Sequence, residues 1–300
     1  MYNGIINIYK EKGFTSHDVV AKMRGICKQK KIGHTGTLDP DAEGVLPVCL
    51  GSGTKLCDML TDKDKEYVAE LLLGVETDTQ DISGRVLKQC EPVMEEEKVR
   101  QAIMGFQGDY MQVPPMYSAL KVNGKKLYEL ARSGKEVERQ ARPVVIRELE
   151  ILSMQLPVVK IRVLCSKGTY IRTLCADIGA ELGCGATMKS LLRTRVGNFE
   201  MKDAITLTQL EQIRDTIGIE SRLCAVDSVF DTCPKLHVSE EYQKRLENGN
   251  AFYPKHTLEK KKYPAGEWVR VYGKDKFYGI YAYEEEKHYY KPVKMFLPEG

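Results

Sequence analysis

The sequence predicts an α+β protein: a mixed, largely antiparallel β-sheet flanked by helices and loops, followed by a small C-terminal β-barrel. The composition, 42% hydrophobic and 29% charged, is typical of globular chains. The length, 300 residues, is enough for two domains. Helical and strand patterns are interspersed without the regular alternation of a doubly wound fold. Aromatic residues gather late in the chain, because 13 of the 24 Phe, Trp and Tyr residues follow residue 234.

Apolar periodicity locates the elements of the long N-terminal part. Ser16 predicts the cap of the first helix, whose spacing puts five apolar residues on one face: Val19, Val20, Met23, Ile26 and Cys27. Gly74 is predicted to end a later strand, and Gly183 to end a later helix. The other predicted elements are strands at 5–9 and 67–73, a helix at 95–106, paired strands at 144–152 and 158–165 joined near Pro157, and a helix at 171–182.

The last 66 residues follow a different pattern. Aromatic and polar residues alternate at 268–272, 277–283 and 289–296, and a turn at 273–276 separates the first two stretches. Such alternation predicts half-buried strands of a small barrel. We place the boundary between residues 231 and 235, which divides the chain into domains 1–231 and 235–300.

Cysteine, histidine and hydropathy patterns exclude several classes of protein. The nine cysteines form no C-x-x-C pair and mostly lie in apolar stretches, which indicates buried free thiols and an intracellular address. The five histidines are scattered without ligand spacing, so we expect no metal. The sequence has no apolar run of about 18 residues and no signal-peptide pattern, so we expect a cytoplasmic chain with no membrane segment.

The distribution of charge indicates a polyanionic partner more clearly than the total does. The net charge is only +3, and residues 235–300 account for it with 13 Lys and Arg against 10 Asp and Glu. Residues 117–142 contain a further seven basic and three acidic side chains. Two basic regions, one of them rich in aromatic residues, are typical of chains that bind nucleic acid.

The segment 33–55 is the first candidate for chemistry. Between 33 and 47 it is rich in Gly and Pro, which predicts a shaped loop and not a helix. Asp39 precedes Pro40, so we expect an extended backbone that holds its carboxylate on a rigid loop. The alternative is an Asx-turn in a surface loop. Residues 51–55 lack the residue order of a phosphate-binding loop.

The segment 166–172 is the second candidate. It reads Ser-Lys-Gly-Thr-Tyr-Ile-Arg, follows a predicted strand and enters a helix. Arg172 could pair with a buried aspartate and keep that carboxylate ionised. The alternative is a helix cap with a surface arginine.

Four blocks stand in order along the chain. They are Gly-His-Thr-Gly-Thr-Leu-Asp-Pro at 33–40 with Ala-x-Gly-Val-Leu-Pro at 42–47, Lys-x-Tyr at 65–67, Val-Pro-Pro-Met-Tyr-Ser-Ala-Leu-Lys-Val at 113–122, and Lys-Gly-Thr-Tyr-Ile-Arg at 167–172. Together they closely resemble the bacterial tRNA pseudouridine-55 synthase family, and residues 235–300 resemble a PUA domain, a small RNA-binding barrel. The chain departs from the family at 9–11, where it has Tyr-Lys-Glu in place of Asp-Lys-Pro.

The resemblance implies the reaction and its catalytic residues. One uridine in the T loop of tRNA becomes pseudouridine, because the N1–C1′ bond breaks, the uracil turns and C5 bonds to C1′, with no cofactor. Asp39 is implied as the nucleophile or as the aid to uracil departure, and Arg172 as its partner. Tyr67 is implied as the ring that stacks on the flipped base and takes the C5 proton. Whether Asp39 attacks C1′, adds to C6 or starts a glycal route stays open.

The resemblance also implies contacts to the RNA. The target base leaves its stack and enters a pocket. Tyr67 and Tyr170 would form the walls, Leu191 would close the pocket, and His34 would fill the vacated space. Plain core for Leu191 and a hydrogen bond within its own loop for His34 are the alternatives. The implied partner is the T loop and elbow of tRNA, bound by a monomer through an insertion at 114–142 and through Lys10, Lys55 and Arg132.

Three other functions are alternatives to this one. A non-catalytic tRNA-binding or folding protein would need the basic surfaces but not Asp39, Tyr67 and Arg172 together. A guide-RNA-dependent pseudouridine synthase would share the aspartate loop and the PUA segment, but the insertion after Pro114 favours the stand-alone type. A hydrolase with paired carboxylates at Asp39 and Asp41 has little support.

Overall fold

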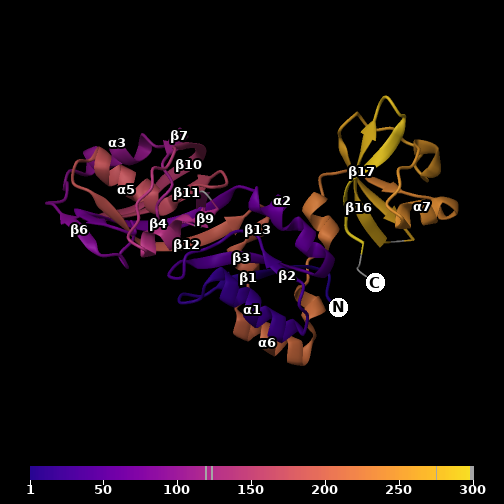
Figure 1. The fold of residues 1–300 in the computed structure, drawn as a ribbon, viewed down its shortest axis with the longest axis horizontal. Helices are drawn as coiled ribbons and strands as arrows, with labels where there is room; N and C mark the ends of the chain where they lie inside the picture. The colour runs from indigo at the N-terminus through magenta and orange to yellow at the C-terminus, as the bar shows by residue number, and fades with distance from the viewer. Residues whose placement is uncertain (119, 123, 275, 298–300) are drawn as a thin grey trace.

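The chain folds around two β-sheets of unequal size (Figure 1). The computed structural model describes residues 1–118, 120–122, 124–274 and 276–297, with the side chains of these residues apart from Lys121, Lys126 and Arg132. Within this part of the chain, nine strands form the large sheet, four form the C-terminal sheet, and two short hairpins stand apart. The predicted fold class, a largely antiparallel mixed sheet with flanking helices, is confirmed, and the segment predicted as a small C-terminal barrel contains a small four-stranded sheet.

The elements have the following bounds. The large sheet contains β1 (Gly4–Lys10), β2 (Ile32–His34), β3 (Glu43–Leu50), β4 (Lys65–Leu73), β7 (Gly108–Gln112), β10 (Arg142–Gln155), β11 (Val158–Cys165), β12 (Ala186–Val196) and β13 (Phe199–Glu200). The hairpins are β5 (Val75–Thr77) with β6 (Val86–Gln89), and β8 (Lys121–Val122) with β9 (Lys125–Lys126). The C-terminal sheet contains β14 (Lys235–His237), β15 (Trp268–Gly273), β16 (Lys276–Glu284) and β17 (Tyr289–Met295). The α-helices described are α1 (Ser16–Cys27), α2 (Cys57–Thr61), α3 (Glu96–Met104), α4 (Leu127–Arg132), α5 (Ile171–Glu181), α6 (Leu207–Thr216) and α7 (Gln243–Glu247).

A seam between β3 and β12 divides the large sheet into two halves. The strand order is β1-β3-β12-β4-β11-β10-β7, with β2 on β3 and β13 on β12. Neighbouring strands are antiparallel except at the seam, where β3 and β12 run parallel. The seam pairs Leu192 with Glu43 and Arg193 with Gly44. A short contact therefore joins a smaller half, β1 to β3, to a larger half that ends at β7.

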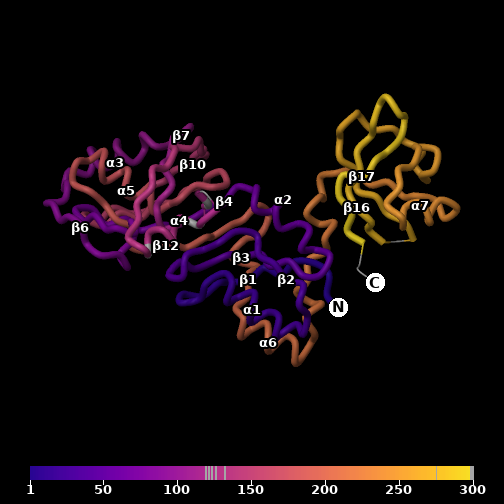
Figure 2. The backbone as a smooth tube through the Cα atoms, viewed as in Figure 1, coloured from indigo at the N-terminus to yellow at the C-terminus, as the bar shows by residue number. Residues whose placement is uncertain are grey.

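Each half of the sheet has its own helices and its own core. α1 and α6 pack together over the smaller half, where Met23 and Leu46 share one apolar cluster (Figure 1 and Figure 2). α3 and α5 cover the larger half, where Val163 and Leu174 belong to another. Each helix presents one apolar stripe to the sheet, as its spacing predicts. The backbones of Ile5, in β1, and Cys224 exchange two hydrogen bonds at 2.9 and 2.8 Å, so a segment late in the chain lies along the N-terminal strand.

The predicted elements are found with small shifts at their ends, but the predicted cap of α1 is wrong. Thr15 is the cap, because its side chain accepts a hydrogen bond from the Asp18 backbone N at 3.1 Å. The Asp18 carboxylate accepts one from the Thr15 backbone N at 2.8 Å, which completes a capping box. Ser16 is instead buried, and its hydroxyl accepts a hydrogen bond from the backbone N of Leu38 at 2.9 Å.

The segment 33–47 is only partly a loop, which corrects the prediction. The loop runs from 35 to 42, whereas the residues from 43 onward form β3 between β1 and β12. The residues of β3 after Glu43 are all buried, so tertiary packing outweighs the Gly and Pro content of the segment. Pro47 stands within the strand opposite Asn7, and its carbonyl accepts a hydrogen bond from the backbone N of Thr35 at 3.2 Å.

The C-terminal sheet packs on the N-terminal part of the chain through an apolar cluster. Phe230, in the 3-10 helix Val226–Phe230, lies with its ring centroid 5.9 Å from that of Phe296. Tyr272 of β15 donates a hydrogen bond to the Asp227 carboxylate at 2.6 Å. The C-terminal strands therefore rest on the segment that precedes them.

Gly44 is required at the seam, and this predicts opposite effects for two Gly→Ala substitutions. The φ of Gly44 is +109°, and an added Cβ would lie 2.2 Å from the carbonyl oxygen of Arg193. Gly25 is exposed in α1 with open space around it. We expect strain to make Gly44→Ala lower the free energy of unfolding by about 1–3 kcal/mol or more. Helix propensity should make Gly25→Ala raise it by about 0.5–1 kcal/mol.

Denaturant unfolding of both variants measures these changes. An unfolding midpoint for Gly44→Ala equal to that of the wild type would show that the seam does not need the close approach.

Candidate active site

The loop between β2 and β3 carries Asp39 and is fixed from several sides. The hydroxyl of Ser16, on α1, binds the backbone N of Leu38. Lys10, the last residue of β1, donates a hydrogen bond to the Pro40 carbonyl at 3.1 Å. The Leu38 side chain is buried in the core of the larger half. These contacts hold Asp39 on a rigid loop at the seam.

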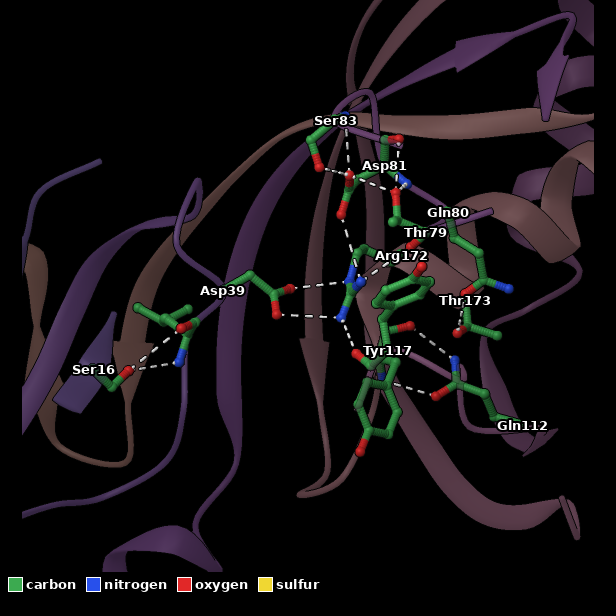
Figure 3. Close-up of polar contacts among 12 residues, drawn as sticks. Ser16, Asp39, Thr79, Gln80, Asp81, Ser83, Gln112, Tyr117, Arg172 and Thr173 are labelled. Carbon is green, nitrogen blue, oxygen red and sulfur yellow. Dashed lines mark hydrogen bonds and ion pairs between the residues drawn. The ribbon is translucent and has the colours of Figure 1, made fainter. Parts of the chain in front are cut away.

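Arg172 lies in the first turn of α5 and reaches across the seam to Asp39 (Figure 3). Its Nε is 3.0 Å from Asp39 Oδ2, and its Nη2 is 3.2 Å from Asp39 Oδ1, which makes a bidentate ion pair. The arginine side chain is 7% exposed and the aspartate side chain 38%. The alternative of a surface arginine is therefore wrong, and the carboxylate remains accessible while the guanidinium is buried.

Three further acceptors fix the Arg172 guanidinium (Figure 3). Its Nη1 donates to the Thr79 carbonyl at 3.0 Å and lies 3.5 Å from Asp81 Oδ2. Its Nη2 donates to the Tyr117 carbonyl at 2.9 Å. Asp81 is itself held, because its Oδ1 accepts hydrogen bonds from the Ser83 backbone N at 3.0 Å and from the Thr79 hydroxyl at 2.8 Å. The guanidinium is therefore locked in orientation toward Asp39.

Sequence reasoning missed Asp81. The residue lies in Thr-Asp-Thr-Gln-Asp-Ile-Ser-Gly at 77–84, a run of short polar side chains between β5 and β6. Such a run is typical of a turn that hydrogen-bonds its own backbone, and its two aspartates were a usable signal for an arginine partner. The partner, Arg172, stands 91 residues further on, so no local pattern links them.

Burial dominates the electrostatics around Asp39. It raises the pKa of the Asp39 carboxyl more than the Arg172 charge lowers it, and the Asp81 charge adds a smaller rise. Burial also lowers the pKa of Lys10 to about 8 and that of His34 to about 4. His34 is therefore neutral near pH 7.

Tyr67 and Arg193 lie side by side near the aspartate loop. They are register partners on β4 and β12, and Arg193 is fully buried while Tyr67 is 7% exposed. Arg193 donates hydrogen bonds to the carbonyls of Val45, at 2.7 Å, and Gly36, at 3.3 Å. Burial raises the pKa of Tyr67 to about 12; Arg193 opposes this rise, and Asp39 adds to it. Arg193 thus links the strand that carries Tyr67 to the loop that carries Asp39.

The other residues predicted for the pocket have mixed surroundings. Tyr170 is the N-cap of α5, and burial, with a smaller effect of Asp39, raises its pKa. Leu191 is 8% exposed and belongs to the core of the larger half, in agreement with the alternative that it is a core residue. His34 Nδ1 accepts a hydrogen bond from the Gly36 backbone N at 3.3 Å, in agreement with the alternative that His34 bonds within its own loop.

The three basic residues predicted to contact RNA differ in their surroundings. Lys55 donates a hydrogen bond to the Met295 carbonyl at 3.1 Å, so it ties η1 (Gly51–Leu56) to the C-terminal sheet. The side chain of Arg132 lies outside the described residues. Lys10 is fully buried, which leaves it no surface for RNA, and its Nζ donates to the carbonyls of Glu11, Phe14 and Pro40.

The arrangement supplies a nucleophile, a phenol and a fixed cation at one place. A carboxylate can attack or assist a leaving group, and a phenol can stack on a base and move a proton. Among the residues that the structure describes, no three His, Cys, Asp or Glu side chains form a group that could hold a metal. None of the described helices has the length and apolar content to cross a membrane.

Family profiles match most of the chain. The profile described as TruB family pseudouridylate synthase (N terminal domain) matches residues 24–171, and the one described as tRNA pseudouridylate synthase B C-terminal domain matches residues 172–228. Two similar relatives are both named tRNA pseudouridine synthase B. The relative from Lachnoclostridium phytofermentans is 52% identical over 98% of this chain and 100% of its own length. The relative from Alkaliphilus oremlandii is 46% identical over 98% of this chain and 97% of its own length.

Two solved structures share the fold. A crystal structure of a Cbf5-Nop10-Gar1 complex matches with a TM-score of 0.73 and 27% identity, over 98% of this chain and 85% of that one. A structure of an H/ACA RNP bound to a substrate RNA containing 2′-deoxyuridine matches with a TM-score of 0.72 and 25% identity, over 98% and 85% of the two chains. With both family profiles in order and relatives similar over nearly the full length, the chain belongs to the TruB family of pseudouridylate synthases.

Proposed function

We propose that this chain isomerises one uridine of tRNA, at position 55 in the T loop, to pseudouridine. The observation that carries the proposal is an accessible Asp39 carboxylate held by a bidentate ion pair with a buried Arg172, with the Tyr67 phenol near enough for the Asp39 charge to shift its pKa. Membership of the TruB family and the name of the relatives, tRNA pseudouridine synthase B, support the substrate. In the balanced reaction the N1–C1′ bond breaks, a C5–C1′ bond forms, C5 loses its proton and N1 gains one.

Each of the three residues has a distinct proposed role. Asp39 attacks C1′, adds to C6 or starts a glycal route, and all three need its ionised form. Arg172 keeps the carboxylate ionised and aimed, because other acceptors fix its guanidinium. Tyr67 stacks on the base and is the proposed acceptor of the C5 proton; it must first lose its own proton, which burial opposes and Arg193 favours.

The proposed pocket receives a base that has left the RNA stack. Flipping costs a few kcal/mol, and stacking on an aromatic ring returns roughly 1–3 kcal/mol per base. Tyr67 and Tyr170 supply the rings and Leu191 an apolar wall. His34, neutral and at the loop end of β2, fills the space that the nucleotide leaves.

The proposed grip on tRNA uses two surfaces and two domains, 1–231 and 235–300. In the insertion at 114–142, Lys125, Lys135 and Arg142 are exposed and suited to phosphate contacts. On the C-terminal PUA-like domain, lysines stack over tyrosines, as Lys261 does over Tyr263 at 4.6 Å. We propose that the chain acts as a cytoplasmic monomer without a cofactor.

Tritium release from tRNA that carries 5-³H-uridine tests the proposal. We expect stoichiometric release by the wild type, none by Asp39→Asn, and tRNA binding by both, because the substitution removes only the carboxylate charge. Asp41→Asn is the matched control, since Asp41 is exposed on the same loop, and it should stay active.

Other outcomes identify the alternatives. Release by Asp39→Asn would remove Asp39 from the chemistry. Intact binding without release from the wild type would point to RNA binding alone or to guide-dependent catalysis.

The raised pKa of Asp39 predicts a loss of activity on the acid side. The rate is full where the carboxylate is ionised and falls as the pH is lowered through the raised pKa, so the midpoint should lie above the ordinary value of 3.8. Single-turnover rates at saturating tRNA, measured from about pH 3 to 8, determine this midpoint. A midpoint at or below the ordinary value would mean that Arg172 outweighs burial.

The contact between Arg172 and Asp81 predicts that Asp81 is needed for rate and not for binding. Asp81→Asn keeps the shape and removes the charge, and loss of one charge-assisted contact of about 1.5 kcal/mol should slow the single-turnover rate about tenfold. Asp78→Asn is the control, because the Asp78 carboxylate accepts a hydrogen bond from the Arg85 backbone N at 2.9 Å and has no contact with Arg172 among the described residues. Equal rates for the two variants would contradict a role for Asp81 through Arg172.

A further inference from the structure

Gln112 stands at the base of the insertion. It is the last residue of β7, where the chain leaves the large sheet, and its register partner is Arg142, where β10 resumes the sheet. Its side chain is polar and only 1% exposed. A buried amide at this point needs hydrogen-bond partners, and their identity shows what the residue does.

The Gln112 amide forms two hydrogen bonds with the backbone of Tyr170 (Figure 3). Its Oε1 accepts from the Tyr170 backbone N at 2.8 Å, and its Nε2 donates to the Tyr170 carbonyl at 3.0 Å. Nε2 also lies 3.5 Å from the hydroxyl oxygen of Tyr110. Because a backbone N only donates and a carbonyl only accepts, these partners fix which way the amide points.

The two hydrogen bonds brace the start of α5. Tyr170 is the N-cap of this helix, which begins without a side-chain cap of its own. Tyr110, also on β7, donates a hydrogen bond to the carboxylate of Asp177 further along the helix. β7 therefore holds α5 at two points, and the first point lies two residues before Arg172.

The insertion also contacts Arg172 directly. The Tyr117 carbonyl, five residues after Gln112, accepts the hydrogen bond from Arg172 Nη2 at 2.9 Å. From this geometry we propose that Gln112 is a positioning residue that sets the angle at which Arg172 meets Asp39. Catalysis then depends on the insertion being packed against the start of α5. The inference rests on the proposed function, since it concerns the rate of the same reaction.

The first test separates rate from binding. Gln112→Leu keeps similar bulk and removes both hydrogen bonds. We expect a roughly 10- to 100-fold lower single-turnover rate at saturating tRNA, the scale of a misplacement of about 1 Å. The Kd for tRNA should stay within about threefold of the wild type, because only transition-state geometry is disturbed. A rate equal to that of the wild type, or a loss confined to Kd, would overturn the inference.

The second test restores the lost donor by pH. Gln112→Glu keeps the acceptor for the Tyr170 N, but its carboxyl donates to the Tyr170 carbonyl only when protonated, and burial favours that form. The ratio of its rate to the wild-type rate should therefore be highest at low pH and fall as the pH rises from about 6 to 9. Gln112→Leu should stay slow throughout, and a flat ratio for Gln112→Glu would overturn the inference.

Gln107→Glu is the matched charge control. Gln107 is exposed just before β7, and its Nε2 lies 3.5 Å from the Arg147 carbonyl. Its rate should follow the wild type at every pH. A wild-type chain that is inactive on tRNA would overturn the proposed function, whereas an active wild type with unaffected Gln112 variants would overturn this inference alone.

Discussion

The short parallel contact between β3 and β12 is the constraint on which the rest of the structure depends. Gly44 allows the two strands to approach, because any Cβ there would collide with the Arg193 backbone. The Arg193 side chain then reaches back to the carbonyls of Val45 and Gly36 in the smaller half. Two halves with separate cores are joined in this way. The pair of Asp39 and Arg172 forms across the join, so its geometry is set by how the halves meet.

The two buried arginines have different electrostatic tasks at this join. Burying a charge is costly unless it is hydrogen-bonded. Arg193 satisfies its charge with backbone carbonyls and serves as a fixed structural cation. Arg172 has two carbonyls and Asp81 besides Asp39, so its position does not depend on the catalytic carboxylate. Asp39 can therefore leave the pair to react without releasing the arginine, which a simple two-member ion pair would not permit.

Patterns set by local physics were predictable from the sequence. Apolar spacing identified α1 and α5. The position of Asp39 before Pro40 on a Gly-rich loop made it a candidate beside an Asx-turn, and the resemblance to a family assigned it the catalytic role. Failures occurred where tertiary contacts decide. β3 contains residues that break strands in isolation, yet its neighbours bury it on both sides. Asp81 and Gln112 have ordinary local sequences, and their partners, Arg172 and Tyr170, lie 91 and 58 residues away. These contacts can therefore be seen only in the folded chain.

Lys10 shows how one backbone position can be held by different chemistry. The resemblance to pseudouridine synthases leads us to expect a proline after this lysine, and a proline ring would stiffen the bend by fixing φ. This chain has Glu11 there, and the buried Lys10 ammonium instead binds the carbonyls of Glu11, Phe14 and Pro40 at 3.2, 2.6 and 3.1 Å. Carbonyl oxygens only accept hydrogen bonds, so a shorter or apolar side chain at position 10 would remove the donor that these three carbonyls share. These contacts go to backbone carbonyls and do not require a proline at position 11, so in this chain the Lys10 ammonium ties the end of β1 to the loop that carries Asp39.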